Sequence, residues 1–171
     1  MWKKDCKEFN GIIPCDELKN PQVEHCGQCN FPRPYDEKVL IIKLGAKGDV
    51  VRSLSVLKPI RKKHKNVHIT WLITKSNKGV LKGQKVDTIL TLSPETQLRL
   101  EIEKFDHVYN LEYDMPASAI MTKIKAKNKY GYYLDEKALP ATYLPEGQQF
   151  LDIAFSDKLN LKNTKTYQKM I

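Results

Sequence analysis

A near-continuous apolar run followed by a glycine-containing loop is the sequence feature that most constrains this fold. Residues 39–44 comprise five aliphatic side chains and Lys43, which is typical of a strand buried on both faces of a parallel sheet. The loop at 45–49 follows directly, and apolar side chains then recur at helical spacing. They are Val50, Leu54, Leu57 and Ile60. We therefore predict a strand, a tight loop and a helix, with Pro59 kinking that helix or ending it early.

The same alternation continues along the chain. Strands are predicted at 67–73, 86–92, 106–111 and 131–134, and helices at 93–103, 117–124 and 150–155. Ser93 fits the N-cap of the first of these helices, with Pro94 at its first position. Strands alternating with helices over about a hundred residues predict an α/β fold with a Rossmann-like parallel sheet. We assign this body to residues 35–150, and residues 151–171 to a helix and a polar linker.

Four cysteines define a separate front segment, residues 1–34. Cys6, Cys15, Cys26 and Cys29 all lie in the first 29 residues, and the remaining 142 hold none. Cys26 and Cys29 form a Cys-x-x-Cys knuckle in which Gly27 permits a tight turn. Because short segments rarely hold a core without a staple, we predict a structural zinc site from the four thiolates. Four free thiols, two disulfides or an iron–sulfur cluster remain alternatives, and His25 could replace one thiolate.

The loop at 45–49 is the place to look for chemistry, because ligands of open α/β sheets bind at the carboxyl ends of the strands. It is neither a Walker A loop nor a dinucleotide fingerprint, since the required Lys-Ser/Thr and third glycine are absent. Asp49 fits either an N-cap or a general base that takes a proton from an acceptor hydroxyl. Arg52 shares its helix face at i+3 and could anchor an anion. Lys43 and Lys47 add positive charge, unless they are ordinary solvated lysines.

These residues resemble glycosyltransferase family 9, the ADP-heptose:lipopolysaccharide heptosyltransferases. The resemblance starts with 38–52 and continues through Leu57, Arg61, 69–72, 86–87, 105–112, Asp114 and 130–132. It covers about residues 38–170 and matches the N-terminal half of the family. Ser55 departs from the pattern, because the family usually has proline there. The cysteine-bearing front resembles an extension seen in some members.

The resemblance implies a GT-B architecture of two Rossmann-like domains and an inverting transfer without a catalytic metal. It implies that Asp49 is the catalytic base and that Lys43, Lys47, Arg52 and Asp114 lie on the acceptor side. The acceptor is then an anionic glycan or glycolipid. The donor, an ADP-heptose-like nucleotide sugar, is expected on a C-terminal domain beyond this chain, so the chain alone is expected to be inactive.

Charge and hydropathy limit the remaining choices. Lys and Arg total 29 against 20 Asp and Glu, a net charge of +9, which suits an anionic partner at a membrane surface. No apolar run is long enough to span a bilayer and no secretory signal is evident, so we expect a cytoplasmic protein with peripheral contact at the inner membrane face. The alternative is a non-catalytic, zinc-stapled binding module with a basic face. Nucleic acid is not the expected partner, because the lysine clusters at 61–65 and 123–129 lack interleaved aromatic residues.

Overall fold

A computed structural model describes residues 1–166, and a single six-stranded sheet forms its centre. The strand order is β3-β2-β1-β4-β5-β6, and every pairing is parallel except that of β5 with β6. The strands are β1 (Glu37–Ile42), β2 (Val67–Ile73), β3 (Thr88–Thr91), β4 (Lys104–Asn110), β5 (Lys125–Leu134) and β6 (Pro140–Thr142). The predicted α/β class with a mostly parallel sheet is confirmed.

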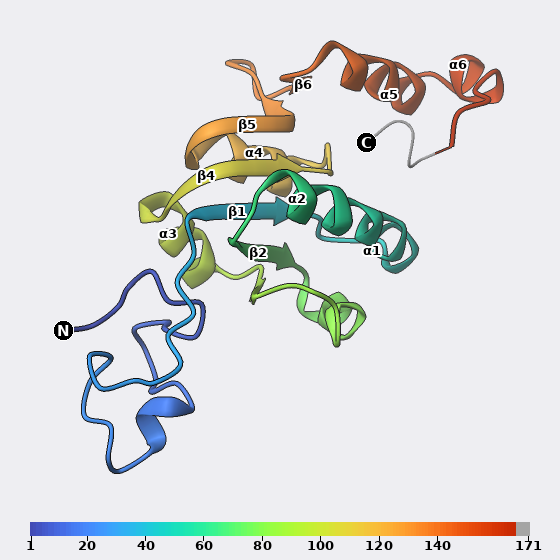
Figure 1. Ribbon diagram of the computed structural model, residues 1–171. Helices are drawn as coiled ribbons and strands as arrows, with labels where there is room; N and C mark the ends of the chain where they lie inside the picture. Colours follow the sequence, from blue (N-terminus) through green and yellow to red (C-terminus); the bar gives the residue numbers. More distant parts are fainter. Residues whose placement is uncertain (167–171) are drawn as a thin grey trace.

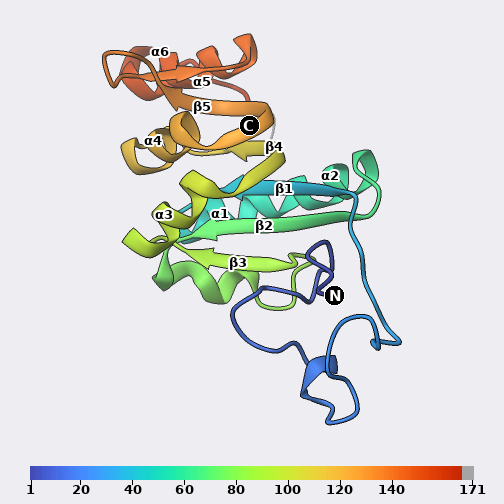
Figure 2. The same ribbon diagram turned by 90° about the vertical axis from the view of Figure 1, so that its left-hand side faces the viewer.

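Helices connect the strands and cover both faces of the sheet (Figures 1 and 2). The α-helices are α1 (Lys47–Ser53), α2 (Leu57–Lys63), α3 (Pro94–Ile102), α4 (Met115–Lys123), α5 (Pro145–Phe155) and α6 (Asp157–Leu161). Short 3₁₀ turns are η1 (Glu17–Lys19), η2 (Leu54–Val56) and η3 (Lys75–Leu81). Ser93 caps α3 as predicted, with its side chain accepting a hydrogen bond from the Thr96 N–H.

Alternate residues of β1 feed two separate cores, as the two-residue period of a strand requires. Val39 and Ile41 join the core beneath α1, α2 and η3, whereas Leu40 and Ile42 join the core beneath α3 and α4. All four side chains are fully buried. The continuous apolar run is therefore explained by a central strand with a helical layer on each side.

The predicted first helix is interrupted, as Pro59 led us to expect. The turn η2 separates α1 from α2 and contains Ser55, the residue four positions before Pro59. A proline ring clashes with that carbonyl and supplies no N–H to it. The chain therefore tightens into a 3₁₀ turn at this point.

Four elements in the second half of the chain differ from the predictions. Strand β5 starts at Lys125, six residues before the predicted 131, and β6 was not predicted. The helix predicted at 150–155 begins at Pro145, and α6 occupies part of the predicted polar linker. The last residues of that linker, 167–171, lie outside the described residues.

Candidate functional site

The candidate site lies at the carboxyl edge of the sheet, between β1 and β4. Strand order reverses there, because β1 connects onward to β2 on one side while β4 lies on its other side. Such a switch point leaves a crevice where neighbouring loops diverge. The loop after β1, residues 43–46, and the loop after β4, residues 111–114, both reach this edge. The predicted residues all come from these two loops or from α1; they are Lys43, Lys47, Asp49, Arg52 and Asp114.

Glu112 joins the two loops through both of its carboxylate oxygens. Oε1 lies 3.0 Å from the Lys43 Nζ. Oε2 accepts hydrogen bonds from the backbone N–H groups of Leu44, at 2.9 Å, and Gly45, at 3.3 Å. Lys43 is only 3% exposed. Lys43 is therefore not a solvated surface lysine, because its ammonium group is held at this edge by an ion pair.

Neighbouring elements hold the other side of the same loop. The Trp71 indole N–H donates to the Lys43 carbonyl at 3.2 Å. The Thr74 hydroxyl and the Asn77 amide donate to the Leu44 carbonyl at 2.8 and 3.0 Å. Trp71 belongs to β2, and Asn77 to η3. The loop that leads into α1 is thus fixed from three directions, which suits a site that needs a rigid support.

Asp49 and Arg52 form an ion pair on the outer surface of α1. Their side chains are 30% and 51% exposed. Asp49 is the third residue of α1, whose N-cap is Ala46 without a side-chain cap. The interpretation of Asp49 as an N-cap is wrong, because the N-cap is Ala46 and the helix starts three residues earlier than that role requires. The predicted shared face of Asp49 and Arg52 is confirmed, and the carboxylate remains accessible for chemistry.

Lys47 and Asp114 are the remaining predicted residues of this edge. Lys47 is the first residue of α1 and is exposed. Asp114 is the N-cap of α4, and its Oδ1 accepts a hydrogen bond from the Ala117 N–H at 2.9 Å. Asp114 therefore has a structural role as well as its place on the loop after β4. Its predicted acceptor-side role, like those of Lys43, Lys47 and Arg52, stays a prediction.

Glu112 and Asn110 are two site residues that we did not single out from the sequence. Asn110 is fully buried; its side-chain amide donates to the Tyr132 carbonyl at 2.7 Å and its Oδ1 accepts from the Glu112 N–H at 3.1 Å. A polar residue ending a buried strand, with a carboxylate two positions later, was the available signal. Gly131 lies against Asn110, and a Cβ there would stand 1.9 Å from the Asn110 carbonyl oxygen.

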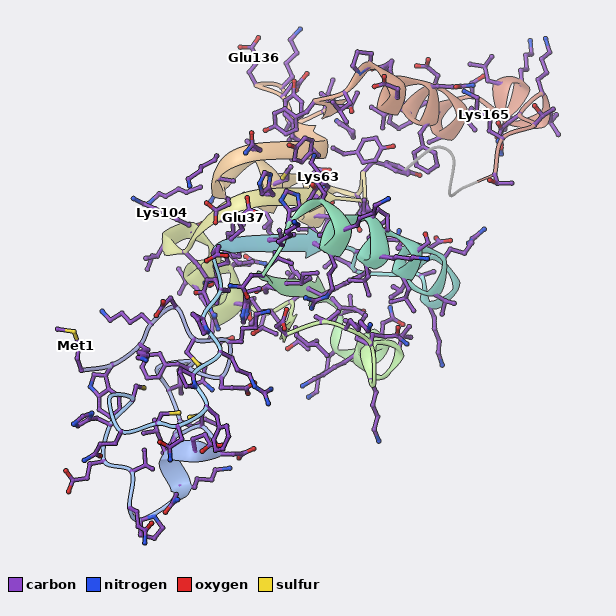
Figure 3. The ribbon with its side chains drawn as sticks, viewed as in Figure 1. Met1, Glu37, Lys63, Lys104, Glu136 and Lys165 are labelled. Carbon is purple, nitrogen blue, oxygen red and sulfur yellow. The ribbon has the colours of Figure 1, made fainter. Side chains whose placement is uncertain are left out.

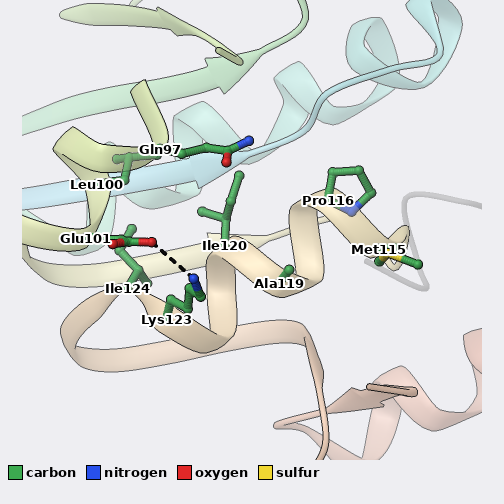
Figure 4. Close-up of a pocket in the computed structure, with 9 residues that line it drawn as sticks. All are labelled: Gln97, Leu100, Glu101, Met115, Pro116, Ala119, Ile120, Lys123 and Ile124. Carbon is green, nitrogen blue, oxygen red and sulfur yellow. Dashed lines mark hydrogen bonds and ion pairs between the residues drawn. The ribbon is translucent and has the colours of Figure 1, made fainter. Parts of the chain in front are cut away.

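Two cavities do not include Asp49 among their lining residues. One, of about 530 Å³, lies over β4 and β5; Lys63, whose side chain Figure 3 labels, is among its lining residues. The other, of about 250 Å³, is a mainly apolar groove between α3 and α4 with a Glu101–Lys123 ion pair of 3.2 Å beside it (Figure 4). Neither is lined by Asp49, Lys47 or Arg52. Asp49 thus lies on the open edge of the sheet, outside both cavities.

The basic clusters contribute to the fold itself. Arg61 donates to the Lys85 carbonyl and to the Asp87 carboxylate, both at 2.8 Å. Lys129 donates to the Met121 carbonyl at 2.8 Å, and Lys127 pairs with Asp106 at 2.6 Å. These three cations already have intramolecular partners. The number of cations available to bind an external anion is therefore smaller than the sequence indicates.

The four cysteines line one small cavity, of about 20 Å³, in the front segment. All four are free thiols rather than disulfides. Within the described part of the chain, however, the cysteine sulfurs do not form a group of three within 4.8 Å of one another. The cysteines converge on one place, but the predicted zinc site is not confirmed. None of the helices described here is long and apolar enough to cross a membrane.

Comparison with known proteins supplies the last observation. No family model matches the chain. It is 29% identical over 133 residues to lipopolysaccharide heptosyltransferase 1 of Campylobacter coli, covering 72% of this chain and 36% of that protein. It is 27% identical over 104 residues to the lipopolysaccharide core heptosyltransferase OpsX of Haemophilus influenzae, covering 56% of this chain and 30% of that protein.

Solved structures agree in fold. A glycosyl transferase of family 9 from Veillonella parvula aligns with a TM-score of 0.50 at 22% identity, over 56% of this chain and 31% of its own. The E. coli heptosyltransferase WaaC, solved with ADP-2-deoxy-2-fluoro heptose, aligns with a TM-score of 0.50 at 12% identity, over 78% of this chain and 45% of its own. The match to the curated relatives spans about a third of their length. The chain is thus similar in sequence to two lipopolysaccharide heptosyltransferases, and its fold resembles that of a glycosyl transferase of family 9.

Proposed function

We propose that this chain is the acceptor-binding portion of a glycosyltransferase that moves a heptose-like sugar from a nucleotide sugar to a hydroxyl of an anionic glycolipid or oligosaccharide. The observation that carries the proposal is the Asp49–Arg52 pair on the open carboxyl edge of the sheet, beside a loop that Glu112 fixes. The homology to heptosyltransferases supports the same reaction class.

Asp49 serves in this proposal as the general base. Its carboxylate takes the proton of the acceptor hydroxyl while that oxygen attacks the anomeric carbon of the donor sugar. A carbon–oxygen bond forms to the acceptor, the bond to the nucleoside diphosphate breaks, and the configuration inverts because the displacement is direct. No catalytic metal is required, because the leaving diphosphate is stabilised by groups of the donor-binding portion.

Arg52 couples acceptor binding to the availability of the Asp49 carboxylate as a base. Without an acceptor its guanidinium engages the Asp49 carboxylate. A phosphate or acidic sugar competes for the same guanidinium through charge-assisted hydrogen bonds. Lys47, exposed at the start of α1, adds charge for the same anion. An anionic acceptor thus releases the Asp49 carboxylate when the hydroxyl is in place.

Donor binding is assigned in this proposal to a second, C-terminal domain in a GT-B arrangement. The matched regions amount to 36% and 30% of the two curated relatives, which leaves ample length for such a domain in those proteins. The chain by itself is then expected to bind acceptor without transferring sugar. The reaction is placed in the cytoplasm, at the inner face of the membrane, where a basic surface meets an anionic glycolipid.

A structural zinc in the front segment completes the proposal. Cys26 is the only buried residue among residues 1–34, so this segment has almost no hydrophobic core of its own. The convergence of four thiols on one cavity supports Cys6, Cys15, Cys26 and Cys29 as ligands. The Arg33 N–H already donates to the Cys6 sulfur at 3.5 Å, a bond that a thiolate ligand would strengthen.

Acceptor binding by this chain tests the proposal. A phosphorylated lipopolysaccharide core fragment is titrated into the ¹⁵N-labelled chain, and amide shifts are expected at 43–52 and 111–114. Arg52→Ala is expected to weaken binding about 10-fold, as loss of a charge-assisted contact does. Lys158→Ala on α6 is the matched control and should bind normally. Shifts confined to other surfaces, or equal binding by both variants, would contradict the proposal.

A further inference from the structure

A second cluster of reactive side chains lies at the opposite edge of the sheet from Asp49. Glu37 is the first residue of β1, His64 follows the last residue of α2, and His107 lies within β4. Their ligand atoms all lie within 4.8 Å of one another. The Glu37 carboxylate contacts both rings, with Oε2 2.9 Å from His64 Nδ1 and Oε1 3.3 Å from His107 Nε2.

The two imidazoles are buried, whereas the carboxylate reaches solvent. The side chains of His64 and His107 are 5% and 12% exposed, against 35% for Glu37. The rings lie against each other with centroids 4.1 Å apart, and His107 also stacks on Tyr130. Figure 3 labels Glu37 near the start of β1. The imidazoles are thus held in place, and the carboxylate marks the point of access.

Tyr109 contacts the ring nitrogen of His64 that does not face Glu37. Its hydroxyl lies 3.2 Å from His64 Nε2. A hydroxyl can donate or accept, so Nε2–H can donate to it and leave the Nδ1 lone pair directed at the cluster. A histidine ligand characteristically donates its other N–H to such a partner. His107 Nδ1, by contrast, is buried and has no hydrogen-bond partner among the described residues.

Charges around the cluster leave one carboxylate to face an incoming cation. Asp106 is paired with Lys127. The Lys63 ammonium lies over the Tyr130 ring, 5.4 Å from its centroid. Among the described residues, Glu37 forms ion pairs only with the two histidines, which are neutral when they act as ligands.

We propose that Glu37, His64 and His107 bind a zinc ion. Two imidazoles and one carboxylate are a ligand set that suits Zn²⁺, with a water in the fourth position. The ion would tie the end of α2 to β1 and β4, which are otherwise distant in sequence. It lies at the amino edge of the sheet, so it takes no part in sugar transfer. Because only His64 has a supporting partner, the affinity is about 10–100-fold below that of a fully supported site of this kind.

Histidine-ring NMR during a Zn²⁺ titration tests the site directly. The chain has four histidines, and His68, which belongs to neither proposed zinc site, serves as the internal reference. The ring signals of His64 and His107 are expected to shift together and to saturate at one equivalent beyond the zinc that the cysteines bind. Co²⁺ loading separates this site from the cysteines, because thiolate ligands alone give an intense sulfur-to-metal charge-transfer band.

Variants make the assignment specific. Glu37→Gln and His107→Gln are each expected to weaken Zn²⁺ binding at this site at least about 10-fold. Tyr109→Phe keeps the ring that stacks on Tyr130 and is expected to weaken binding about 10–100-fold, so it remains informative if the ligand variants fold poorly. Glu136→Gln, on an exposed turn, is the matched control. Rings that respond to pH but not to Zn²⁺, or equal affinity in Tyr109→Phe and the control, would overturn the proposal.

Discussion

Glu112 shows how one side chain can organise the edge of a sheet. Its two oxygens accept from Lys43 Nζ and from two backbone N–H groups of the preceding loop. Lys43 was predicted to add positive charge beside the loop at 45–49, but its partner Glu112 lies 69 residues away in the sequence. The register that brings them together, with Ile42 opposite Asn110, is a property of the folded sheet. Local sequence patterns do not specify it.

Removing Glu112 is expected to destabilise the chain. Glu112→Ala leaves the buried Lys43 ammonium without its ion pair, which costs about 3–5 kcal/mol in the free energy of unfolding. Urea denaturation of the wild type and the variant measures the difference. Glu136→Ala, on an exposed turn, should stay within about 0.5 kcal/mol. Equal losses in the two variants would show that the Lys43–Glu112 contact does not hold the loop.

At the scale of elements, the hydrophobic periodicity of the sequence predicted the buried strands well, but it predicted the sheet edge formed by β5 and β6 poorly. Strand β5 runs from Lys125, yet β6 pairs only with its last three residues. Its first half is therefore an edge, and lysines at 125, 127 and 129 are the kind of charge that protects an edge from further pairing. The same lysines disrupt the apolar signal of a strand. The helix α6 was missed because it buries no residue.

Glu103 connects α3 with β1 and is expected to make stability depend on pH. Burial opposes its ionisation, but hydrogen bonds from Arg99 and Lys38 together outweigh this effect and lower its pKa below the ordinary value of 4.5. The native state then binds fewer protons than the unfolded state, so the stabilisation is present above pH 4.5 and is lost as the pH falls below it.

Glu103→Gln tests this linkage. At pH 7 the variant is expected to lose about 1–3 kcal/mol of unfolding free energy, and the difference from wild type should shrink as the pH falls toward 3. Urea denaturation at several pH values gives this profile. Glu101→Gln on the same helix breaks only an exposed pair with Lys123 and should cost less than about 1 kcal/mol. A difference that does not change with pH would contradict the predicted shift.

At the scale of the whole molecule, the front segment and the α/β body are held by different means. The body has two apolar cores, one on each side of the sheet. Residues 1–34 contain a single buried residue, Cys26. An isolated antiparallel β-bridge pairs Cys6 with Pro34 and so joins the two ends of the segment. The Tyr35 N–H also donates a hydrogen bond to the Asp5 carbonyl at 2.9 Å. This contrast is why we expect the front segment to depend on a metal for its folding, whereas the body has apolar cores of its own.

Loss of the knuckle should therefore affect only the front segment. Cys26→Ser is expected to make residues 1–34 sensitive to limited proteolysis, because a segment without a core depends on its staple. The urea unfolding transition of the body should change by less than about 0.5 kcal/mol. Asn30→Ser, a nearby exposed substitution, is the control. Cleavage of both variants at the same rate would remove the cysteines from any structural role.

The sequence predicted the site in outline. The strand, loop and helix at 39–60 predicted the switch-point edge, and Asp49 and Arg52 share a helix face there as expected. The N-cap role of Asp49 was wrong because helix starts depend on backbone geometry around Ala46. The contacts of Glu112 and Asn110, and the cluster of Glu37 with two histidines, depend on pairing between strands far apart in sequence. Only the three-dimensional structure supplies that pairing.

The most direct test of the account is the rate of sugar transfer with Asp49→Asn. It is measured in a protein that carries this chain together with the donor-binding portion, with an ADP-heptose donor and a lipopolysaccharide core acceptor. Asparagine is nearly isosteric with aspartate but cannot take a proton, so kcat is expected to fall about 10²–10⁴-fold with little change in acceptor KM. Asp157→Asn on α6 should leave the rate unchanged. Transfer by Asp49→Asn within a few-fold of the wild-type rate would contradict the role of Asp49 as base.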